Sequence, residues 1–381
     1  MSMNDLLRKM AVILEKKQDA LFSYDVEKQK KYIKKLGNTE SDIQRSYFQY
    51  KCQMKFNGKI TTFILNIVSI PMVFFYIFRY GKNIVKQNIK KVDAVFFRDG
   101  KPENILPDSL KLEFEKIEKN PIEGILLTSQ DKAFIKQIIA QYPLSWHFIL
   151  KCIIKIGRYS FVIKKYNPDA IIVCAEYSFT SSVLSLYCKR NEVEHIDVMH
   201  GEKLYYMRDS FFRFDRCYVW DEYYKNLLCE LNADKEQFVI EVPQSLKIKN
   251  TKSNEIQYDY TYYLGSEHVA VLKKIAVILK ELKDKGNRIC IRPHPRYSDI
   301  QQIKKIFSFA IIEISSEVSI EESLLSTKNT VALYSTVLNQ ALYNSISVII
   351  DDVSNPINYK KLRELEYFCL EKEHKLLSEL I

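Results

Sequence analysis

The feature that most constrains this chain is an alternation of short β-branched runs and longer amphipathic segments, which begins at residue 92. In the first part of this region, such runs predict strands at 92–98, 124–128, 170–175, 195–199, 217–220 and 238–242. Segments with helical periodicity, including 132–141 and 178–190, lie between many of them. Strands that alternate with helices indicate an α/β fold with a parallel sheet.

The alternation resumes after a polar, strand-poor segment, 243–255, which we interpret as a linker. Beyond it we expect strands at 258–264, 288–292, 310–314, 330–333 and 347–350, and helices at 267–285, 298–308, 319–327 and 336–344. A last amphipathic segment, 359–380, predicts a C-terminal helix. A chain of 381 residues is long enough for two domains. The pattern therefore predicts two Rossmann-like domains that face a cleft, 92–245 and 256–358, followed by a helix at 359–381.

Basic charge is concentrated before the α/β region. The whole chain has 57 Lys and Arg against 47 Asp and Glu, and residues 1–91 alone hold 18 and 7 of these. No acidic residue occurs between Asp42 and Asp93. Because residues 1–60 also have a helical pattern, we expect a basic helical extension at 1–91. The remainder is nearly neutral, so the charge pattern argues against a nucleic-acid-binding protein.

Within this extension, the 16 residues of 63–78 are almost entirely apolar. They are fewer than the roughly 20 that span a bilayer, and Asn66 and Pro71 interrupt them. Two interpretations remain open. The segment is either an interfacial one that rests on anionic lipid, or a buried core helix with basic neighbours.

The eight cysteines form no CxxC pair and no Cys/His spacing suited to zinc. Several lie in apolar runs, as Cys174 and Cys290 do, so we expect buried, reduced thiols. The N-terminus has no short apolar core of the signal-peptide kind. We therefore expect a cytoplasmic protein, peripheral at the inner face of the cell membrane.

Glycine-rich phosphate motifs are missing from the sequence. There is no GxGxxG after a strand, no GxxxxGK[ST] and no Asp-x-Asp. We therefore expect no metal and no cofactor. A bound phosphate would instead be held by helix N-termini, hydroxyls, His and Arg.

Two stretches of the second domain meet that requirement. The predicted strand 288–292 runs into Arg292-Pro293-His294-Pro295-Arg296, which places an imidazole between rigid prolines and two guanidinium groups. The strand 330–333 is followed by Ser335 and Thr336 at the start of a helix, where hydroxyls and backbone N–H groups bind anions. In an open α/β sheet, ligands bind at this carboxyl edge.

Further residues complete the predicted nucleotide-binding set of the second domain. Glu321 and Glu322 begin a predicted helix, where a carboxylate can accept hydrogen bonds from ribose hydroxyls or serve as ordinary capping. Gly265 follows the first strand of this domain.

A third stretch lies in the first domain, where the strand 195–199 ends at His200-Gly201-Glu202. The glycine permits a tight turn and the close approach of a ligand. His200 is the candidate general base, with Glu202 or Asp197 setting its tautomer. We expect the other histidines to be structural.

The order of these motifs resembles that of bacterial GT-B glycosyltransferases of surface-glycan assembly, and most of all the sialyltransferases of capsule and lipooligosaccharide synthesis. The resemblance covers about residues 170–350. It is carried by the His-Gly pair, FDRCYVW at 214–220, RPHPR at 292–296, EESLL at 321–325 and LYST at 333–336. It implies a GT-B-like fold and a metal-independent, inverting transfer of sialic acid, or a related nonulosonic acid, from a CMP donor to a glycan or lipid-linked glycan.

The resemblance also implies roles for individual residues. His294, Ser335 and Thr336 would contact the CMP phosphate, and Glu321 or Glu322 would hold the ribose. The pattern departs from these families at the base, because they have Asp or Glu before the glycine where this chain has His200.

Two alternatives remain open. The His-Gly and Arg-Pro-His-Pro motifs also resemble the CDP-glycerol glycerophosphotransferases of teichoic-acid synthesis, in which both histidines matter. The segment 258–267 lacks the further phosphate clamp expected of that class. The other alternative is a non-catalytic scaffold of a capsule-assembly complex, which would bind no nucleotide.

Overall fold

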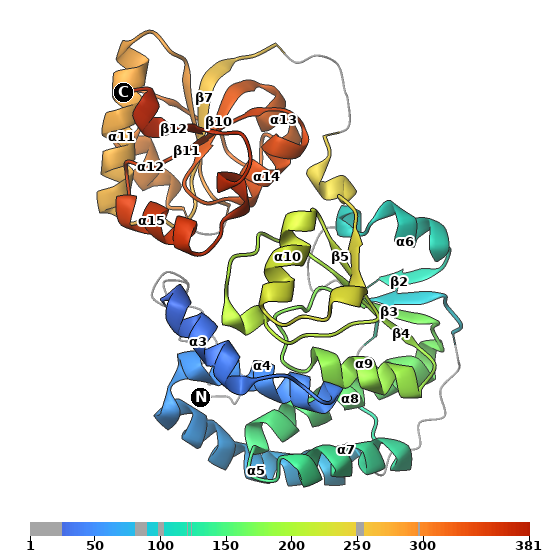
Figure 1. Cartoon of the computed structure of the whole chain (residues 1–381). Helices are drawn as coiled ribbons and strands as arrows, with labels where there is room; N and C mark the ends of the chain where they lie inside the picture. Colours follow the sequence, from blue (N-terminus) through green and yellow to red (C-terminus); the bar gives the residue numbers. More distant parts are fainter. Residues whose placement is uncertain are drawn as a thin grey trace. The chain divides into compact units, whose positions relative to one another are not determined.

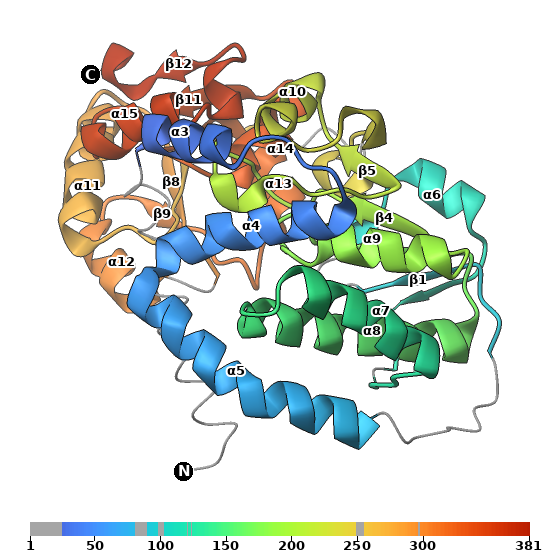
Figure 2. The ribbon, with the colours of Figure 1, turned by 60° about the horizontal axis from the view of Figure 1, so that its bottom comes forward.

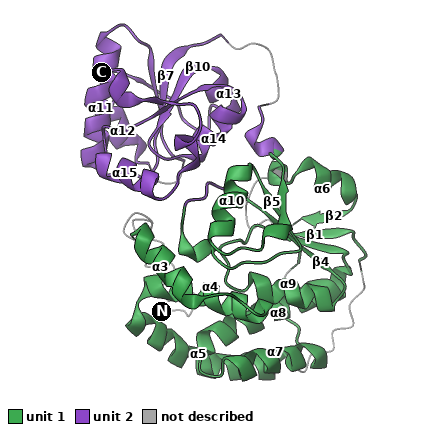
Figure 3. Ribbon diagram, in the orientation of Figure 1, with its two compact units in different colours: residues 1–200, 205–243 green, residues 201–204, 244–381 purple. Residues whose placement is uncertain are grey.

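The computed structural model describes residues 25–80, 90–97, 103–119, 121–122, 124–248, 255–295 and 298–381. The chain divides into two compact units (Figures 1 and 3). Unit 1 comprises Met1–His200 and Tyr205–Pro243, and unit 2 comprises Gly201–Leu204 and Gln244–Ile381. Each unit is built on one six-stranded sheet.

The sheet of unit 1 has the strand order β2-β1-β3-β4-β5-β6, with every neighbouring pair parallel. Its strands are β1 (Ala94–Phe96), β2 (Ile117–Lys119), β3 (Ala170–Val173), β4 (Glu194–Val198), β5 (Arg216–Val219) and β6 (Phe238–Ile240). The order of the first five matches the flavodoxin-like doubly wound arrangement. In such a sheet the order reverses between β1 and β3, and ligands bind at the carboxyl ends of the strands there.

Helices cover both faces of a doubly wound sheet of this type. Those of unit 1 are α3 (Val26–Leu36), α4 (Asp42–Asn57), α5 (Lys59–Tyr80), α6 (Asp108–Glu113), α7 (Ser129–Gln141), α8 (Trp146–Tyr166), α9 (Ser181–Arg190) and α10 (Glu222–Glu230). The central strands are buried on both faces, and β3 has no exposed residue. That burial explains why the strands are continuous apolar runs rather than alternating ones.

The sheet of unit 2 has the order β12-β11-β10-β7-β8-β9, again with every neighbouring pair parallel. Its strands are β7 (Tyr258–Tyr263), β8 (Ile289–Arg292), β9 (Ile311–Ile312), β10 (Thr327–Ala332), β11 (Ser347–Ile350) and β12 (Lys375–Leu376). Counted within the unit, this is the 3-2-1-4-5-6 order of dinucleotide-binding folds, with the reversal between β7 and β10.

The helices of unit 2 are α11 (Val269–Asp284), α12 (Ile300–Ile306), α13 (Ile320–Leu325), α14 (Thr336–Tyr343) and α15 (Pro356–Glu364). On α11, Leu272, Ile275, Leu279 and Leu282 are buried at a helical spacing and pack on the sheet. The prediction of two Rossmann-like α/β units is therefore confirmed.

The predicted strand at 124–128 is wrong, although all five residues are described. The Leu126 N–H donates to the Gly157 carbonyl of α8 at 3.0 Å, and Leu126 and Leu127 are buried. A Cβ on Gly157 would lie 2.7 Å from Ile125, so the glycine allows this segment to approach the helix closely. The apolar run therefore packs on a helix, and β2 takes its place in the sheet.

The predicted helix at 359–380 is also wrong beyond its first turns. The helix α15 ends at Glu364, and Glu366 has a left-handed φ of 58°. Tyr367 and Phe368 then enter the core, and β12 pairs with β11 at the edge of the sheet. The amphipathic pattern arose from core contacts of a turn and a short strand, so residues 359–381 belong to unit 2.

The basic segment 25–80 is not a separate extension, in contrast to the boundary that we expected at residue 91. Its helices α4 and α5 pack on α9 and α8 of unit 1, as Figures 1 and 2 both show. The Ser46 hydroxyl accepts the Val183 N–H at 2.8 Å, and Arg45 donates to the Asn232 carbonyl at 2.9 Å. Residues 1–24 lie outside the described residues.

Two histidines that we expected to be structural are indeed core residues. Tyr159 and Ser185 contact His195 at 3.0 and 2.8 Å through Nε2 and Nδ1. Burial, with a smaller effect from Lys155, lowers the pKa of His195 to about 3, and burial lowers that of His147 to about 4.

These pKa values predict acid sensitivity. Because the folded pKa of His195 lies below the unfolded value near 6.5, only the unfolded chain binds this proton at intermediate pH. The free energy of unfolding should therefore fall as the pH drops from about 6.5 toward 3, by about 1.4 kcal/mol per pH unit for such a group. Urea unfolding at pH 5 and pH 7 measures this, and His195→Gln should reduce the dependence. An unchanged pH dependence in that variant would contradict the assignment.

Candidate active site

At the carboxyl edge of unit 1, a short loop joins β3 to α9 and carries Glu176. The loop is held by its own hydrogen bonds, since Ser178 N–H donates to the Ala175 carbonyl and the Ser181 hydroxyl donates to the Ala175 and Ser178 carbonyls, all at 2.7–2.8 Å. The side chain of Glu176 is only 1% exposed. This rigid loop lies at the end of a strand that flanks the reversal of strand order.

His200 follows the neighbouring strand β4, and its imidazole approaches the carboxylate of Glu176. The Nδ1 atom of His200 lies 3.4 Å from Oε1 of Glu176. The imidazole is 24% exposed, so the carboxylate is inside and part of the ring faces outward. The two groups do not form a hydrogen bond in this structure, although both Nδ1 of His200 and the carboxylate oxygens of Glu176 are buried. Contacts between catalytic groups are often long or poorly aligned before a substrate binds, so a carboxylate this close can still act on the imidazole.

Two further side chains surround this pair. The Tyr177 ring meets the His200 ring edge to face, with centroids 5.9 Å apart. Arg208 lies over the same tyrosine at 5.4 Å and is fixed by a 2.9 Å ion pair with Asp209. Burial alone would lower the pKa of Arg208, but the charge of Asp209 and, less strongly, that of Glu176 raise it. A permanent cation, 42% exposed, therefore lies over the tyrosine ring that contacts the histidine.

The helix α4 holds this loop in place from behind. Buried Gln49 donates from Nε2 to the carbonyls of Glu176 and Arg208, at 2.9 and 3.0 Å. A third tie comes from Asp197, which accepts the Ala175 N–H at 2.6 Å and the Cys217 thiol at 3.6 Å. Asp197 is thus a structural anchor of the loop, and the prediction that it sets the tautomer of His200 is wrong.

Glu202, the other candidate partner for His200, belongs to the short segment that packs with unit 2. The pKa of Tyr367 is raised by burial, by Cys369 and by the charge of Glu202. Burial and the same carboxylate raise the pKa of the Cys369 thiol. The side chain of Glu202 therefore faces this part of unit 2, and Glu176 takes the place that we had expected for it.

In unit 2, Ser335 and Thr336 lie at the carboxyl end of β10, beside the reversal of strand order. Ser335 is the N-cap of α14, and its hydroxyl accepts the Val337 N–H at 3.2 Å. The Tyr367 hydroxyl touches the backbone N and O of Ser335, both at 3.4 Å. Thr336 is exposed at the first helical position. Both residues therefore lie where they were predicted.

His294 follows β8 at the same edge. Its N–H donates to the Ser298 hydroxyl at 2.9 Å, which closes the turn around Pro295, and its side chain is partly exposed. Pro295 is exposed in this turn. Arg296, the second predicted guanidinium, lies outside the described residues.

Arg292 was predicted to bind the nucleotide, and the structure gives its side chain two partners within the protein. Its buried guanidinium forms an ion pair with Glu313, which follows β9, and donates to the Val318 carbonyl at 2.8 Å. A guanidinium paired in this way ties β8 to β9 and to the segment before α13. Arg292 is a structural residue of unit 2.

Gly265, predicted to belong to the nucleotide-binding set, has its backbone donor used within its own loop. Its N–H donates to both carboxylate oxygens of Glu267, at 2.9 and 2.8 Å. A Cβ at this position would lie 3.3 Å from the carboxylate. Burial, together with Asp351, raises the pKa of Glu267 against the lowering effect of these hydrogen bonds.

The two candidate ribose ligands differ in their environment. Glu322 forms a capping box with Ser319, since its carboxylate accepts the Ser319 N–H at 2.9 Å. Backbone and side-chain hydrogen bonds from Ser319 lower the pKa of Glu322. Glu321 has no such bond among the described residues. Capping therefore accounts for Glu322, whereas the partly exposed Glu321 has no capping role.

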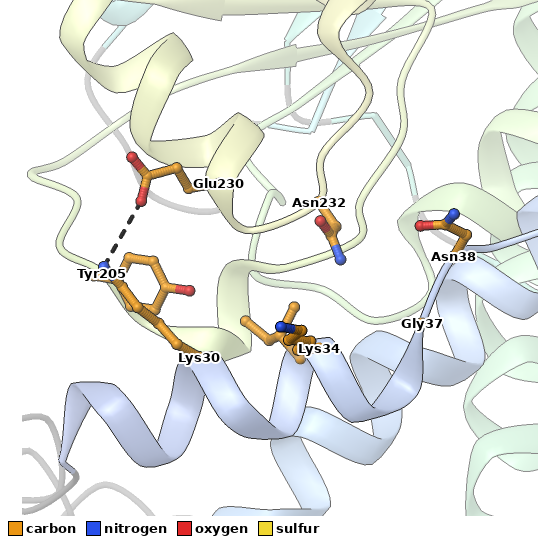
Figure 4. A pocket seen from close by; sticks show the side chains of 8 residues that line it. Lys30, Lys34, Gly37, Asn38, Tyr205, Glu230 and Asn232 are labelled. Atoms are coloured by element: carbon orange, nitrogen blue, oxygen red, sulfur yellow. Dashed lines mark ion pairs between the residues drawn. The ribbon is translucent and has the colours of Figure 1, made fainter.

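Figure 4 shows a surface pocket of about 390 Å³ that none of the predicted residues lines. It lies between α3 and the end of α10, with Lys30, Lys34, Tyr205 and Glu230 on its walls. Lys30 is paired at 3.9 Å with Glu230, across the Tyr205 ring. No group of three His, Cys, Asp or Glu side chains suited to a metal occurs in the part of the chain that the structure describes.

Sequence reasoning placed His200, His294, Ser335 and Thr336 after strands, where the structure has them, and did not consider Glu176 and Arg208. A signal for Glu176 was present, because it is the first charged residue after the apolar run at 170–175 and so marks the end of a buried strand. No comparable signal marked Arg208. Only the tertiary structure brings it to the Tyr177 ring.

No family model matches this chain, and no curated protein matches it. Among solved structures, a putative UDP-N-acetylglucosamine 2-epimerase from Listeria monocytogenes is similar with 10% identity and a TM-score of 0.45, over 75% of this chain and 89% of that one. MurG from Acinetobacter baumannii has 8% identity and a TM-score of 0.42, over 77% and 87%. The wall teichoic acid polymerase TagF has 12% identity and a TM-score of 0.38, over 77% and 80%. Likeness at this level gives no activity, and the fold class rests on the two parallel sheets themselves.

Proposed function

We propose that the protein is a glycosyltransferase that transfers a sugar from a nucleotide-activated donor to a glycan hydroxyl, with His200 as the base. The observation that carries the proposal is the pair formed by buried Glu176 and partly exposed His200 at the carboxyl edge of unit 1. A buried carboxylate close to an imidazole can stabilise the positive charge that the ring gains when it accepts a proton. Such pairs occur often at functional sites. Its position beside the reversal of strand order is where α/β sheets bind ligands.

The reaction assigns one task to each group. Nε2 of His200 takes the proton of the acceptor hydroxyl, and the carboxylate of Glu176, 3.4 Å from Nδ1, stabilises the imidazolium that forms. The acceptor oxygen bonds to the anomeric carbon as the bond from that carbon to the phosphate oxygen breaks, so the configuration inverts. The nucleotide leaves with the electron pair of that bond. In unit 2, His294, Ser335, Thr336 and the N-terminus of α14 would stabilise the leaving phosphate.

We propose CMP-sialic acid, or the CMP derivative of a related nonulosonic acid, as the donor. The proposal is supported by the resemblance of RPHPR at 292–296 and LYST at 333–336 to the bacterial sialyltransferases. In unit 1, Arg208 provides a fixed cation for a carboxylate, which sialic acid carries.

A second candidate is the transfer of glycerol phosphate from CDP-glycerol. It is favoured by one observation, that a histidine and not a carboxylate precedes Gly201 at the position of the base. Both candidates use a cytidine nucleotide, and they differ in the number of phosphates and in the group transferred.

A donor screen separates the two. The purified full chain is incubated with CMP-sialic acid, CDP-glycerol or UDP-sugars and candidate glycan acceptors, and nucleotide release is measured. We expect release of CMP from CMP-sialic acid that depends on the acceptor, and tight binding of CMP by calorimetry.

Other outcomes of the screen have definite meanings. Release of CMP from CDP-glycerol alone would establish the second candidate. Absence of binding by CMP and CDP alike would exclude both and favour the scaffold.

A further inference from the structure

The helix α5 exposes a broad apolar surface. Among the described residues it is the one helix long and apolar enough to cross a membrane, with 22 residues and a mean hydropathy of 2.0 over its best window, of which only 11% is buried. Ile60, Phe63 and Phe78 are 77%, 65% and 71% exposed. Ile64, Phe74 and Phe75 are also more than half exposed. Soluble proteins rarely expose such a contiguous apolar patch unless it binds something.

Two polar residues in the middle of α5, Asn66 and Ser69, turn away from this surface. The Asn66 side chain accepts the His147 N–H at 3.1 Å and so caps the first turn of α8. Ser69 is buried and donates to the Leu65 carbonyl, and Val73 is buried beside it on the same stripe. Figure 2 shows α5 at the periphery of unit 1, and its inner face packs along α8. Asn66, one of the two interruptions of the apolar run in the sequence, is therefore a contact with α8, and the other, Pro71, is an exposed apolar residue of the outer face.

The position of α5 excludes the second of the two interpretations of 63–78. A buried core helix would have its apolar residues inside, whereas only Ser69 and Val73 of α5 are buried. Packing along α8 also fixes α5 to a folded unit over its length, which prevents a perpendicular crossing of a bilayer.

Charge flanks the apolar surface and does not enter it. The residues between Lys59 and Arg79 carry no charge. Lys55 is exposed one turn before the start of α5, and no acidic residue occurs between Asp42 and Asp93. An apolar face with cations at its ends is the pattern of helices that lie in the interface of an anionic bilayer.

We propose that the outer face of α5 docks the protein on an anionic lipid surface, with the helix axis in the membrane plane and Phe63, Phe75 and Phe78 inserted among the acyl chains. The 22-residue helix is about 33 Å long. The inference does not rest on the transferase assignment, because lipid binding requires neither donor nor acceptor.

Two observations favour lipid over a second copy of this chain. Protein interfaces carry about one hydrogen bond per 100–200 Å², and from Ile60 to Phe78 the exposed face of α5 offers one polar side chain, Thr61. Two copies paired through α5 would also place Lys59 and Arg79 near the same residues of the other copy, in either relative direction. Cations repel there, and they are attracted by anionic lipid.

Sedimentation of the full chain with vesicles tests the proposal. We expect binding to vesicles of phosphatidylglycerol and phosphatidylcholine, and weaker binding to phosphatidylcholine alone. The double variant Phe63→Glu/Phe75→Glu should weaken binding about 100-fold, about tenfold for each lost side chain. The control Leu112→Glu/Ile357→Glu adds the same charge at residues that are 85% and 74% exposed elsewhere, and it should bind as the wild type does.

Fluorescence gives a second measurement that does not depend on the variants. Trp146 lies next to α5, with its ring 6.1 Å from that of Phe74, whereas the other tryptophan, Trp220, is buried. Brominated lipids should quench Trp146 in the wild type.

Three results would overturn the proposal. They are equal binding of the wild type and the Phe63→Glu/Phe75→Glu variant, no binding of the wild type to either vesicle, and a wild-type dimer in solution that this variant dissociates. The last result would make α5 an interface between two copies.

Discussion

Replacing His200 with Asn should lower kcat for transfer by about 10²–10⁴-fold and leave the affinity for CMP nearly unchanged. General-base catalysis contributes this range, and Asn removes the basic nitrogen while retaining a polar side chain of similar size. His200 lies on unit 1, whereas the predicted nucleotide contacts lie on unit 2, so donor binding should survive. Nucleotide release at saturating donor, together with calorimetry for CMP, measures the two effects separately.

Glu176→Gln tests the carboxylate behind the base. Glutamine cannot stabilise the imidazolium, so kcat should fall by a smaller factor than in His200→Asn, with little change in the affinity for CMP. A structural role alone would lower stability and leave kcat of the folded enzyme unchanged. His268→Asn, at an exposed histidine that precedes α11, is the matched control and should keep full activity. Full activity in His200→Asn would refute the proposed base.

Removing the carboxylate of Glu313 should destabilise unit 2 by about 3–5 kcal/mol, because Arg292 would remain buried without its ion-pair partner. Both side chains are less than a tenth exposed. Glu313→Leu is the direct test, measured as the free energy of unfolding in urea. In the double variant Arg292→Met/Glu313→Leu, which removes both charges, much of this stability should return.

The same variants decide whether Arg292 contacts nucleotide. If the ion pair is structural, the double variant should bind CMP nearly as the wild type does. Loss of CMP binding in a stably folded double variant would show that the guanidinium reaches the phosphate, as the sequence had suggested.

Most strands were predictable because a parallel strand buried on both faces must be apolar throughout, and such runs are visible in the sequence. The failures at 124–128 and 359–380 have one cause. Burial also selects apolar residues in a segment that packs on a helix, as Leu126 and Leu127 do, and in a turn that enters the core, as Tyr367 and Phe368 do. A local hydrophobic pattern indicates that a residue is buried, but it does not indicate which part of the protein buries it.

The candidate site was predictable to the same extent. The strand ends that carry His200, His294 and Ser335 can be identified in the sequence, because polar residues follow apolar runs there. The sequence could not predict which carboxylate lies next to His200. Glu202 is two residues away and was the obvious candidate, whereas Glu176 is 24 residues away in the sequence. The internal partners of Arg292 and Gly265, which are Glu313 and Glu267, could not be predicted from the sequence either.

The sequence by itself therefore determined the α/β class, the two-unit division and the strand ends at which polar chemistry gathers, because these follow from local hydrophobic periodicity. Only the tertiary structure decided that Glu176 lies behind His200, that Arg292 is an internal ion pair, and that α5 is exposed. These facts depend on which surfaces contact each other in the folded protein. Hydrophobic periodicity predicts that a segment has an apolar face, but it does not predict what covers that face.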